Sequence, residues 1–208
     1  MTRTFCQHFR NTRQYKSLRV IVTVAGVLLI TITAFAVPAD ARSVYFMVEG
    51  GGALQSGPDS FQETFDNGLG GAAVVGFNTG SNIDVVGRVE YYRFGWHQGS
   101  TSFDFGSVGA FLFSASTMFS FNDEDDAYRP FFIVGYGTAD LSRNGGSDEI
   151  ITQYDSDDLQ GFFQLGAGVD FRLTDMFRLQ ITGRYISVNS ASGGEATSFF
   201  PLTVGIRF

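Results

Sequence analysis

Residues Phe177 to Val188 read FRLQITGRYISV, and apolar and polar side chains alternate along this stretch. A period of two is typical of a β-strand that has one apolar and one polar face. One face carries Phe177, Leu179, Ile181, Gly183 and Tyr185, and the other carries Arg178, Gln180, Thr182 and Arg184. The stretch therefore predicts a sheet that separates an apolar from a polar environment.

Seven further segments carry the same alternation, four of them less sharply. They cover residues 43–54, 69–78, 83–94, 108–121, 129–141, 163–173 and 200–208. Each is long enough for a tilted membrane strand, which needs about 9–11 residues. The phase of 129–141 stays open, because the neighbours Phe131 and Phe132 stand on opposite faces and either one fits the apolar side.

Short and long connections alternate between the eight segments. The short ones are polar turns at 79–82, 122–127 and 174–176, and the long ones are polar loops at roughly 55–68, 97–107, 142–160 and 189–197. Outer-membrane barrels have short turns at one end and longer loops at the other. The alternation therefore predicts an up-and-down strand order.

The polar face of these segments carries nearly balanced charge. It holds four acids and five arginines, namely Glu49, Asp84, Glu90, Asp170, Arg88, Arg172, Arg178, Arg184 and Arg207. Buried charges need partners, and a guanidinium pairs with a carboxylate through two hydrogen bonds. Eight strands close into a barrel that its own side chains just fill. We therefore expect an all-β, eight-stranded, antiparallel up-and-down transmembrane barrel with these nine residues as a charge network in a polar lumen.

Aromatic residues recur near the ends of the segments. Examples are Tyr45, Phe77, Tyr91, Phe121, Phe177 and Phe208. Aromatic side chains form girdles at both membrane interfaces of such barrels, and we expect these residues to lie in the girdles.

The first 41 residues differ from the rest of the chain. Residues 1–19 hold five basic residues and no acid, and residues 20–37 form an uncharged apolar run of 18 residues. Ala39 and Ala41 then supply the small-x-small pattern that a signal peptidase reads. These features predict a signal peptide over residues 1–41 and a mature barrel domain over residues 42–208. An uncleaved anchor helix is the alternative, because 18 apolar residues are just enough to span a bilayer.

The charge balance and the motifs exclude several classes of function. Five of the 14 basic residues and one of the 21 acids lie in residues 1–41, so the remainder holds nine arginines against 20 acids. Binding to nucleic acid needs clustered cations, so no nucleic-acid partner is expected. The acidic runs 122–126 and 155–158 lack the glycine of a calcium loop, which favours solvated loops. No nucleotide-binding or Cys/His metal motif occurs, and we expect neither a cofactor nor a metal site.

His97 is the one histidine after residue 41, and Ser100 follows three residues later. Nucleophilic catalysis needs the serine within hydrogen-bond reach of the imidazole and an acid to orient the ring. The spacing, with Gly99 between the two and no clear acidic neighbour, favours an ordinary loop histidine. We therefore expect no catalytic residue.

Two stretches carry a family resemblance: Leu202 to Phe208, LTVGIRF, and Arg129 to Gly137, RPFFIVGYG. With them, residues 42–208 resemble the small eight-stranded outer-membrane barrels of Gram-negative bacteria, the group that contains the OmpA membrane domain, OmpX and the Opa proteins. Pro201 departs from a regular last strand, because proline removes a ladder donor and suggests a bulge.

The resemblance implies an integral protein of the cell outer membrane, with extracellular loops and with turns and C-terminus in the periplasm. It implies outer-membrane lipid and lipopolysaccharide as surroundings. It also implies that Val204, Ile206 and Phe208 form a signal that the barrel assembly machinery reads during biogenesis.

We expect a non-enzymatic protein of surface structure or interaction, in adhesion or envelope integrity, that acts through four extracellular loops. A filled lumen is not a channel, which disfavours transport. A lipid A-modifying enzyme and a small passive pore stay open as alternatives.

Deleting Phe208, or adding a short polar extension after it, is expected to leave unfolded protein in the periplasm, because the resemblance places the assembly signal at the very end of the chain. Heat-modifiable gel mobility of outer-membrane fractions measures the compact form. If normal amounts of a slightly weakened barrel still assemble, Phe208 is a girdle residue only.

Overall fold

A computed structural model describes residues 44–79, 82–96, 107–123, 126–144, 159–189 and 196–208. The chain divides into two compact units, Met1–Val37 and Pro38–Phe208, and all described residues lie in the second. The predicted signal peptide, with its cleavage residues Ala39 and Ala41, lies outside the described residues.

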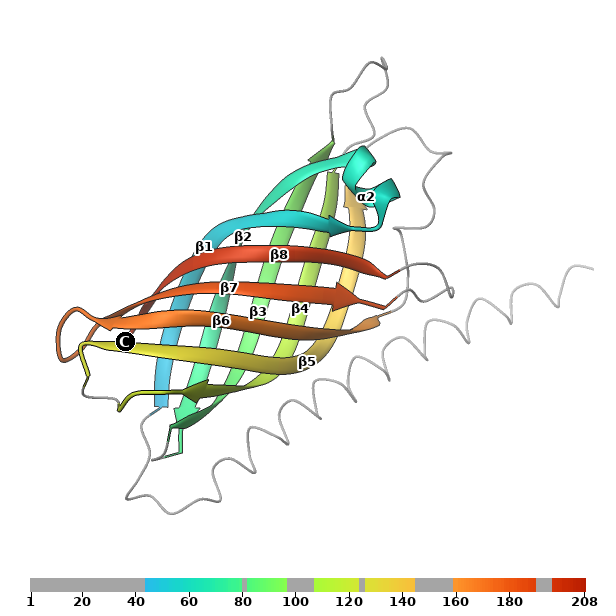
Figure 1. The fold of residues 1–208 in the computed structure, drawn as a ribbon. Coiled ribbons are helices and arrows are strands. Elements are labelled where there is room, and N and C mark those ends of the chain that lie inside the picture. The colour runs from blue at the N-terminus through green and yellow to red at the C-terminus, as the bar shows by residue number, and fades with distance from the viewer. Residues whose placement is uncertain (1–43, 80–81, 97–106, 124–125, 145–158, 190–195) are drawn as a thin grey trace, which may run out of the picture. The chain divides into compact units, whose positions relative to one another are not determined.

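Eight antiparallel strands form a closed barrel, in which strands that follow one another in the chain are paired and β8 pairs with β1 (Figure 1). The strands are β1 (Val44–Gly57), β2 (Phe65–Asn78), β3 (Ile83–Trp96), β4 (Ser107–Ser120), β5 (Tyr128–Asn144), β6 (Gln160–Arg172), β7 (Arg178–Val188) and β8 (Thr197–Arg207). The predicted up-and-down barrel is confirmed. Closure matters because hydrocarbon offers no hydrogen-bond partner to an open sheet edge.

Side chains alternate between the lumen and the outer surface, and this settles the open phase of β5. Phe131 is 2% exposed and faces the lumen, whereas Phe132 is 41% exposed. The Phe132 ring stacks on Phe119 of β4 with centroids 4.6 Å apart. Arg129 has the parity of Phe131 and is buried in the lumen as well.

The two ends of the barrel differ. One end, called the turn end below, holds the short connections after β2, β4 and β6, together with Val44 and Phe208 (Figure 1). The other end, called the loop end, holds the connections after β1, β3, β5 and β7.

The first connection at the loop end is not the predicted polar loop over 55–68. It contains the helix α2 (Asp59–Thr64), and β1 and β2 extend up to it. Phe61 of α2 is buried, and its ring lies 5.3 Å from the rings of both Phe65 and Phe94. Burying an aromatic side chain contributes about 1.5–3 kcal/mol, which explains why this segment packs onto the barrel. Among the residues that the structure describes, no helix is long and apolar enough to cross a membrane.

The lumen is apolar near the loop end, which corrects the prediction of a polar interior throughout. We call this buried cluster the aromatic plug; it consists of Ala53, Phe61, Phe65, Tyr92, Phe94, Val108, Ala110, Leu112, Ala139, Leu141, Phe162, Ile186, Val188 and Phe199. At its centre, Phe199 meets Tyr92 and Phe94 nearly edge to face, with centroids 5.6 and 5.3 Å apart. Near this end both faces of several strands are apolar, so alternation alone does not reveal which face is inside.

Outward side chains form an apolar belt around the barrel. On β3 the belt runs from Ile83 to Tyr91, and on β8 it runs from Phe208 back to Phe200. A polar outward residue follows at the loop end, Arg93 on β3 and Ser198 on β8. Ten residues of a strand that is tilted by about 40° span about 25 Å along the barrel axis, the height of the apolar band of an outer-membrane barrel.

Pro201 breaks a ladder but does not create the predicted bulge. Pairing between β7 and β8 runs to Gly183–Leu202 and resumes at Ile186–Phe199 in the same register. Proline has no N–H to donate, so the gap lies at Pro201. The irregularity between β1 and β8 lies elsewhere, between Gln55 and Gly57.

Large lumen side chains lie over glycines of neighbouring strands. Atoms of the first residue come within 3 Å of the place where a glycine Cβ would stand in the pairs Tyr45–Gly76, Tyr92–Gly70, Phe94–Gly68, Phe131–Gly168 and Arg184–Gly166. The lumen of an eight-stranded barrel is narrow. These glycines therefore make room for rings and for one buried guanidinium.

Gly70→Ala is expected to destabilise the barrel by about 1–3 kcal/mol, the usual cost of overpacking. Its Cβ would stand 2.3 Å from the carbonyl oxygen of Tyr91 and 2.3 Å from the Tyr92 ring. Gly50→Ala on the neighbouring strand is the matched control, since its nearest atom would be 3.9 Å away. Urea unfolding of the two variants in lipid vesicles, followed by gel mobility, measures the difference. Equal urea midpoints would contradict the close packing of Gly70.

Candidate functional site

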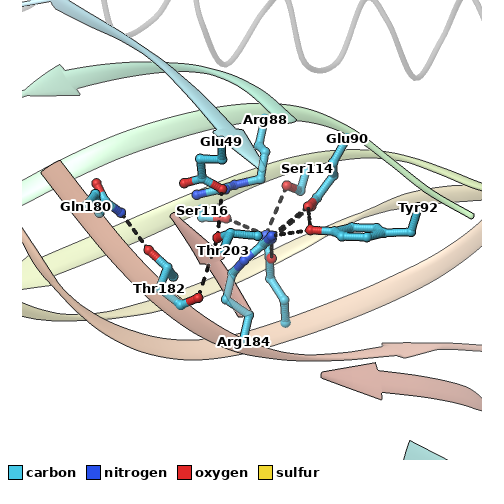
Figure 2. A network of polar contacts seen from close by, with 11 residues as sticks. Glu49, Arg88, Glu90, Tyr92, Ser114, Ser116, Gln180, Thr182, Arg184 and Thr203 are labelled. Atoms are coloured by element: carbon cyan, nitrogen blue, oxygen red, sulfur yellow. Dashed lines mark hydrogen bonds and ion pairs between the residues drawn. The ribbon is translucent and has the colours of Figure 1, made fainter. Parts of the chain in front are cut away.

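Two buried ion pairs lie in the middle of the lumen (Figure 2). Arg184 of β7 binds Glu90 of β3 with both terminal nitrogens of its guanidinium. Nη2 donates to Oε2 at 2.7 Å, and Nη1 donates to Oε1 at 2.9 Å. Arg88 of β3 donates from Nη1 to Oε2 of Glu49 on β1. All four residues are buried, so each charge depends on its partner for the interactions that water would otherwise provide.

Neutral groups add hydrogen bonds to the terminal nitrogens of Arg184 and to Glu90, whereas the buried Nε of Arg184 has no hydrogen-bond partner among the described residues. The Tyr92 hydroxyl accepts from Arg184 Nη2 at 2.9 Å and donates to Glu90 Oε2 at 3.0 Å. Gln164 Oε1 accepts from Arg184 Nη1 at 2.8 Å, and its Nε2 donates to the hydroxyls of Ser114 and Ser116 at 3.0 and 2.8 Å. This group of side chains links β3, β4, β6 and β7 across the lumen.

The Glu49–Arg88 pair is tied to the closing strands. The Thr203 hydroxyl of β8 donates to Glu49 Oε2 at 3.2 Å and also lies 3.5 Å from the carbonyl oxygen of Thr182 on β7. Gln180 Nε2 donates to the Thr182 hydroxyl at 3.0 Å (Figure 2). The pair therefore connects β3 with β1 and, through Thr203, with β8.

A second group of charges lies nearer the turn end. Asp170 of β6 accepts on Oδ2 from Arg178 Nε at 2.8 Å and from Arg207 Nη1 at 3.3 Å. Arg178 Nη2 also donates to the carbonyl oxygen of Asp126 at 3.3 Å. One buried carboxylate thus joins β6, β7 and β8.

Tyr45 and Arg129 complete this second group around Asp84. The Tyr45 hydroxyl donates to Asp84 Oδ2 at 3.3 Å, and Arg129 Nη1 lies 3.6 Å from the same oxygen. The Arg207 guanidinium stacks on the Tyr45 ring, 3.7 Å from its centroid, which is an attractive cation–π geometry. This contact bridges β1 and β8, the first and last strands of the barrel.

The structure places eight of the nine predicted network residues in the lumen, and they are Glu49, Asp84, Arg88, Glu90, Asp170, Arg178, Arg184 and Arg207. The assignment of Arg172 is corrected. Arg172 is the last residue of β6, its side chain is 33% exposed, and it pairs with Asp175 of the following turn at 2.6 Å. The alternation indicates on which face of β6 Arg172 lies, but the lumen ends before the last residue of this strand.

Arg129 is the lumen arginine that the sequence did not reveal. It precedes Pro130 in the segment whose phase was ambiguous, and pairing of β5 with β6 sets that phase. With Arg129 in place of Arg172, the described lumen still holds four acids and five arginines.

The expected girdle residues divide in two groups. Tyr91, Phe121, Phe177 and Phe208 are exposed. Tyr45 points into the lumen, so the girdle interpretation of this residue is corrected. Phe77 is buried but lies on the outward face of β2, where it pairs with the exposed Val44.

The residues of the expected assembly signal lie on the outer surface of β8. Val204, Ile206 and Phe208 are exposed. Phe208 exchanges two backbone hydrogen bonds of 2.9 Å with Phe46 of β1, and their rings stack with centroids 6.5 Å apart. The C-terminal residue therefore completes the β1–β8 junction at the turn end.

The remaining candidates lie outside the described residues. These are His97, Ser100, the run 155–158, and Glu124 and Asp125 of the acidic run 122–126. The other residues of that run lie in the turn after β4, where the Asp123 N–H donates to the Asp126 carboxylate at 3.1 Å. Within the described ranges, no group of three or more His, Cys, Asp or Glu side chains is placed to hold a metal ion.

Residues 24–208 match the family model of the outer membrane protein beta-barrel domain. The chain belongs to this family and is an integral outer-membrane β-barrel. No curated protein sequence matches it significantly.

Several solved structures share the fold. The crystal structure of Neisserial surface protein A matches with a TM-score of 0.59 at 17% identity, covering 81% of this chain and 98% of that one. OprG from Pseudomonas aeruginosa matches with a TM-score of 0.52 at 11% identity, covering 81% and 97%. The outer membrane enzyme PagL matches with a TM-score of 0.40 at 13% identity, covering 80% and 99%. These likenesses concern the fold alone.

Arg184→Ala is expected to destabilise the barrel by about 3–5 kcal/mol, because it leaves the Glu90 carboxylate buried without its cation. Arg172→Ala is the matched control and should change stability little, since its partner Asp175 is exposed to solvent. Urea unfolding monitored by heat-modifiable mobility compares the two. An Arg184→Ala barrel as resistant to urea as the parent would contradict the interior role of Arg184.

Proposed function

We propose that this barrel is a non-enzymatic protein of the bacterial surface, which acts in adhesion or envelope integrity through its four loop-end connections. In this proposal the loop end faces the outside of the cell, and the turn end and Phe208 face the periplasm. The short turns after β2, β4 and β6 support this orientation, because outer-membrane barrels have short turns on the periplasmic side.

The observation that carries the proposal is a lumen filled in two ways. In the middle, the Arg184–Glu90 pair joins the opposite strands β7 and β3, and the Arg88–Glu49 pair joins β3 and β1. Towards the loop end, the aromatic plug packs ring against ring, with Phe61 of α2 among the rings. A solute would have to separate both the ion pairs and the rings, so the filled lumen argues against the passive pore.

The lumen charges also argue against a catalytic role for the barrel interior. Each of the four lumen carboxylates interacts with at least one arginine. General acid–base catalysis needs a titratable group that a substrate reaches. A lipid A-modifying activity would instead depend on residues such as His97 and Ser100, whose spacing does not favour it.

Three kinds of partner belong to the proposal. The belt faces membrane lipid, and its loop-end border faces lipopolysaccharide if the loops lie outside. The exposed side chains of Val204, Ile206 and Phe208 form the assembly signal, which the machinery reads before Phe208 pairs with Phe46.

The purified outer-membrane form is expected to give no stepwise conductance in planar bilayers. Discrete channel openings would favour the pore.

On whole cells, an impermeant maleimide is expected to label Ser147→Cys and Ser192→Cys but not Ser81→Cys. The parent is the control, because its one cysteine, Cys6, lies in the predicted signal peptide. Labelling of Ser81→Cys without labelling of the other two variants would overturn the orientation.

A deletion strain separates the remaining alternatives. Altered adhesion or detergent sensitivity with an unchanged lipid A mass supports the surface role. A lipid A mass that changes on deletion, and returns on complementation, would establish the enzyme instead.

A further inference from the structure

Two arginines among the described side chains lie outside the lumen, Arg93 and Arg172. Arg172 pairs with Asp175 at the turn end. Arg93 lies on the outer surface of β3 near the loop end, is exposed, and pairs with no carboxylate of the described residues. A cation on the outer wall of a membrane barrel needs a partner in the membrane or its interface.

The height of Arg93 on β3 places it at a membrane interface. The outward belt residues of β3 run from Ile83 to Tyr91, and Arg93 is the next outward position. Ten residues from Ile83 correspond to about 25 Å along the barrel axis. A lipid-facing arginine is strongly unfavourable at the midplane and tolerated near the headgroups, so this position fits the headgroup layer.

Three polar side chains gather around Gly109 on this wall. Arg93 Nε donates to the hydroxyl of Ser107 at 3.1 Å, and Ser107 is 3% exposed. Gly109 of β4 pairs with Arg93. The Tyr91 hydroxyl lies over Gly109, 2.9 Å from where its Cβ would stand. We call Tyr91, Arg93 and Ser107 around Gly109 the Arg93 patch.

The chemistry of the Arg93 patch suits a phosphate group. The Ser107 hydroxyl accepts the hydrogen bond of the Arg93 Nε–H. This contact holds the guanidinium against the wall and leaves its two terminal nitrogens to face a ligand. This pair of nitrogens matches the spacing of phosphate oxygens. Next to the patch, Leu69 pairs with Arg93 from β2 and is 74% exposed, which provides an apolar surface for an acyl chain.

We propose that the Arg93 patch binds a phosphate of lipid A in the outer leaflet, with the acyl chains against the apolar belt. The assignment of lipid A rests on the proposed function, in which the loop end faces outside. A phospholipid headgroup presents the same phosphate chemistry, so the test separates the two sources.

Native mass spectrometry of the purified barrel in detergent measures the binding of bisphosphorylated lipid A, dephosphorylated lipid A and phosphatidylglycerol. Arg93→Gln is expected to weaken binding of bisphosphorylated lipid A by roughly three- to tenfold, the range for losing one interfacial cation. Arg93→Lys should keep part of the affinity, because it keeps the charge but loses the second donor. Arg172→Gln is the matched control and should bind as the parent does. Heat-modifiable mobility establishes that each variant is folded.

Equal binding of dephosphorylated lipid A, or an unchanged affinity of Arg93→Gln, would overturn the phosphate site. Phosphatidylglycerol bound as tightly as lipid A would overturn the lipid A assignment. If the binding test rejects the Arg93 patch, but Ser147→Cys is labelled on whole cells and the barrel gives no conductance, the proposed function still holds. If Ser81→Cys is labelled on whole cells and Ser147→Cys is not, the orientation on which the lipid A assignment depends is overturned.

Discussion

An eight-stranded barrel has room inside only for its own side chains, and every charge in that room has to be paired there. The bidentate contact between Arg184 and Glu90 meets both requirements, since it fills the middle of the lumen and leaves neither charge alone. Removing either partner would bury an uncompensated ion. Tyr92 and Gln164 add hydrogen bonds to the pair, and Ser114 and Ser116 hold Gln164, which turns one ion pair into a contact among four strands.

The same shortage of space explains the two halves of the lumen. Near the loop end, rings fill the interior and need no polar partner, and α2 adds Phe61 to them. In the middle and near the turn end, arginines paired with carboxylates share the interior with a second apolar cluster, which includes Met118, Phe131 and Ile133. Glycines on neighbouring strands make both arrangements possible, because Tyr92 and Arg184 occupy the volume that Cβ atoms of Gly70 and Gly166 would take. Several of the described glycines therefore make room for the large side chains inside.

The arginines of the barrel differ in the direction in which their side chains point, and therefore in the groups that they meet. Five arginines point inward and neutralise carboxylates that belong to the barrel itself. Arg93 points outward at the border of the apolar belt, where we propose that it meets lipid headgroups. With the lumen filled, interactions with other molecules fall to the outer wall and the loop end, which is the physical basis of the surface role that we propose.

The strand count, the up-and-down order and eight of the nine lumen charges could be predicted from the sequence, because a period of two in side-chain polarity shows that each strand separates two environments. The sequence did not distinguish Phe131 from Phe132, since both are apolar, and it therefore missed Arg129. It also assigned Arg172 to the lumen, because alternation reports a side of the strand but not where the lumen ends. The folding of α2 onto the loop end and the partner of each charge were decided only by the tertiary structure. Closure brings Glu90 and Arg184 together although 94 residues separate them, and no local pattern carries information about such a contact.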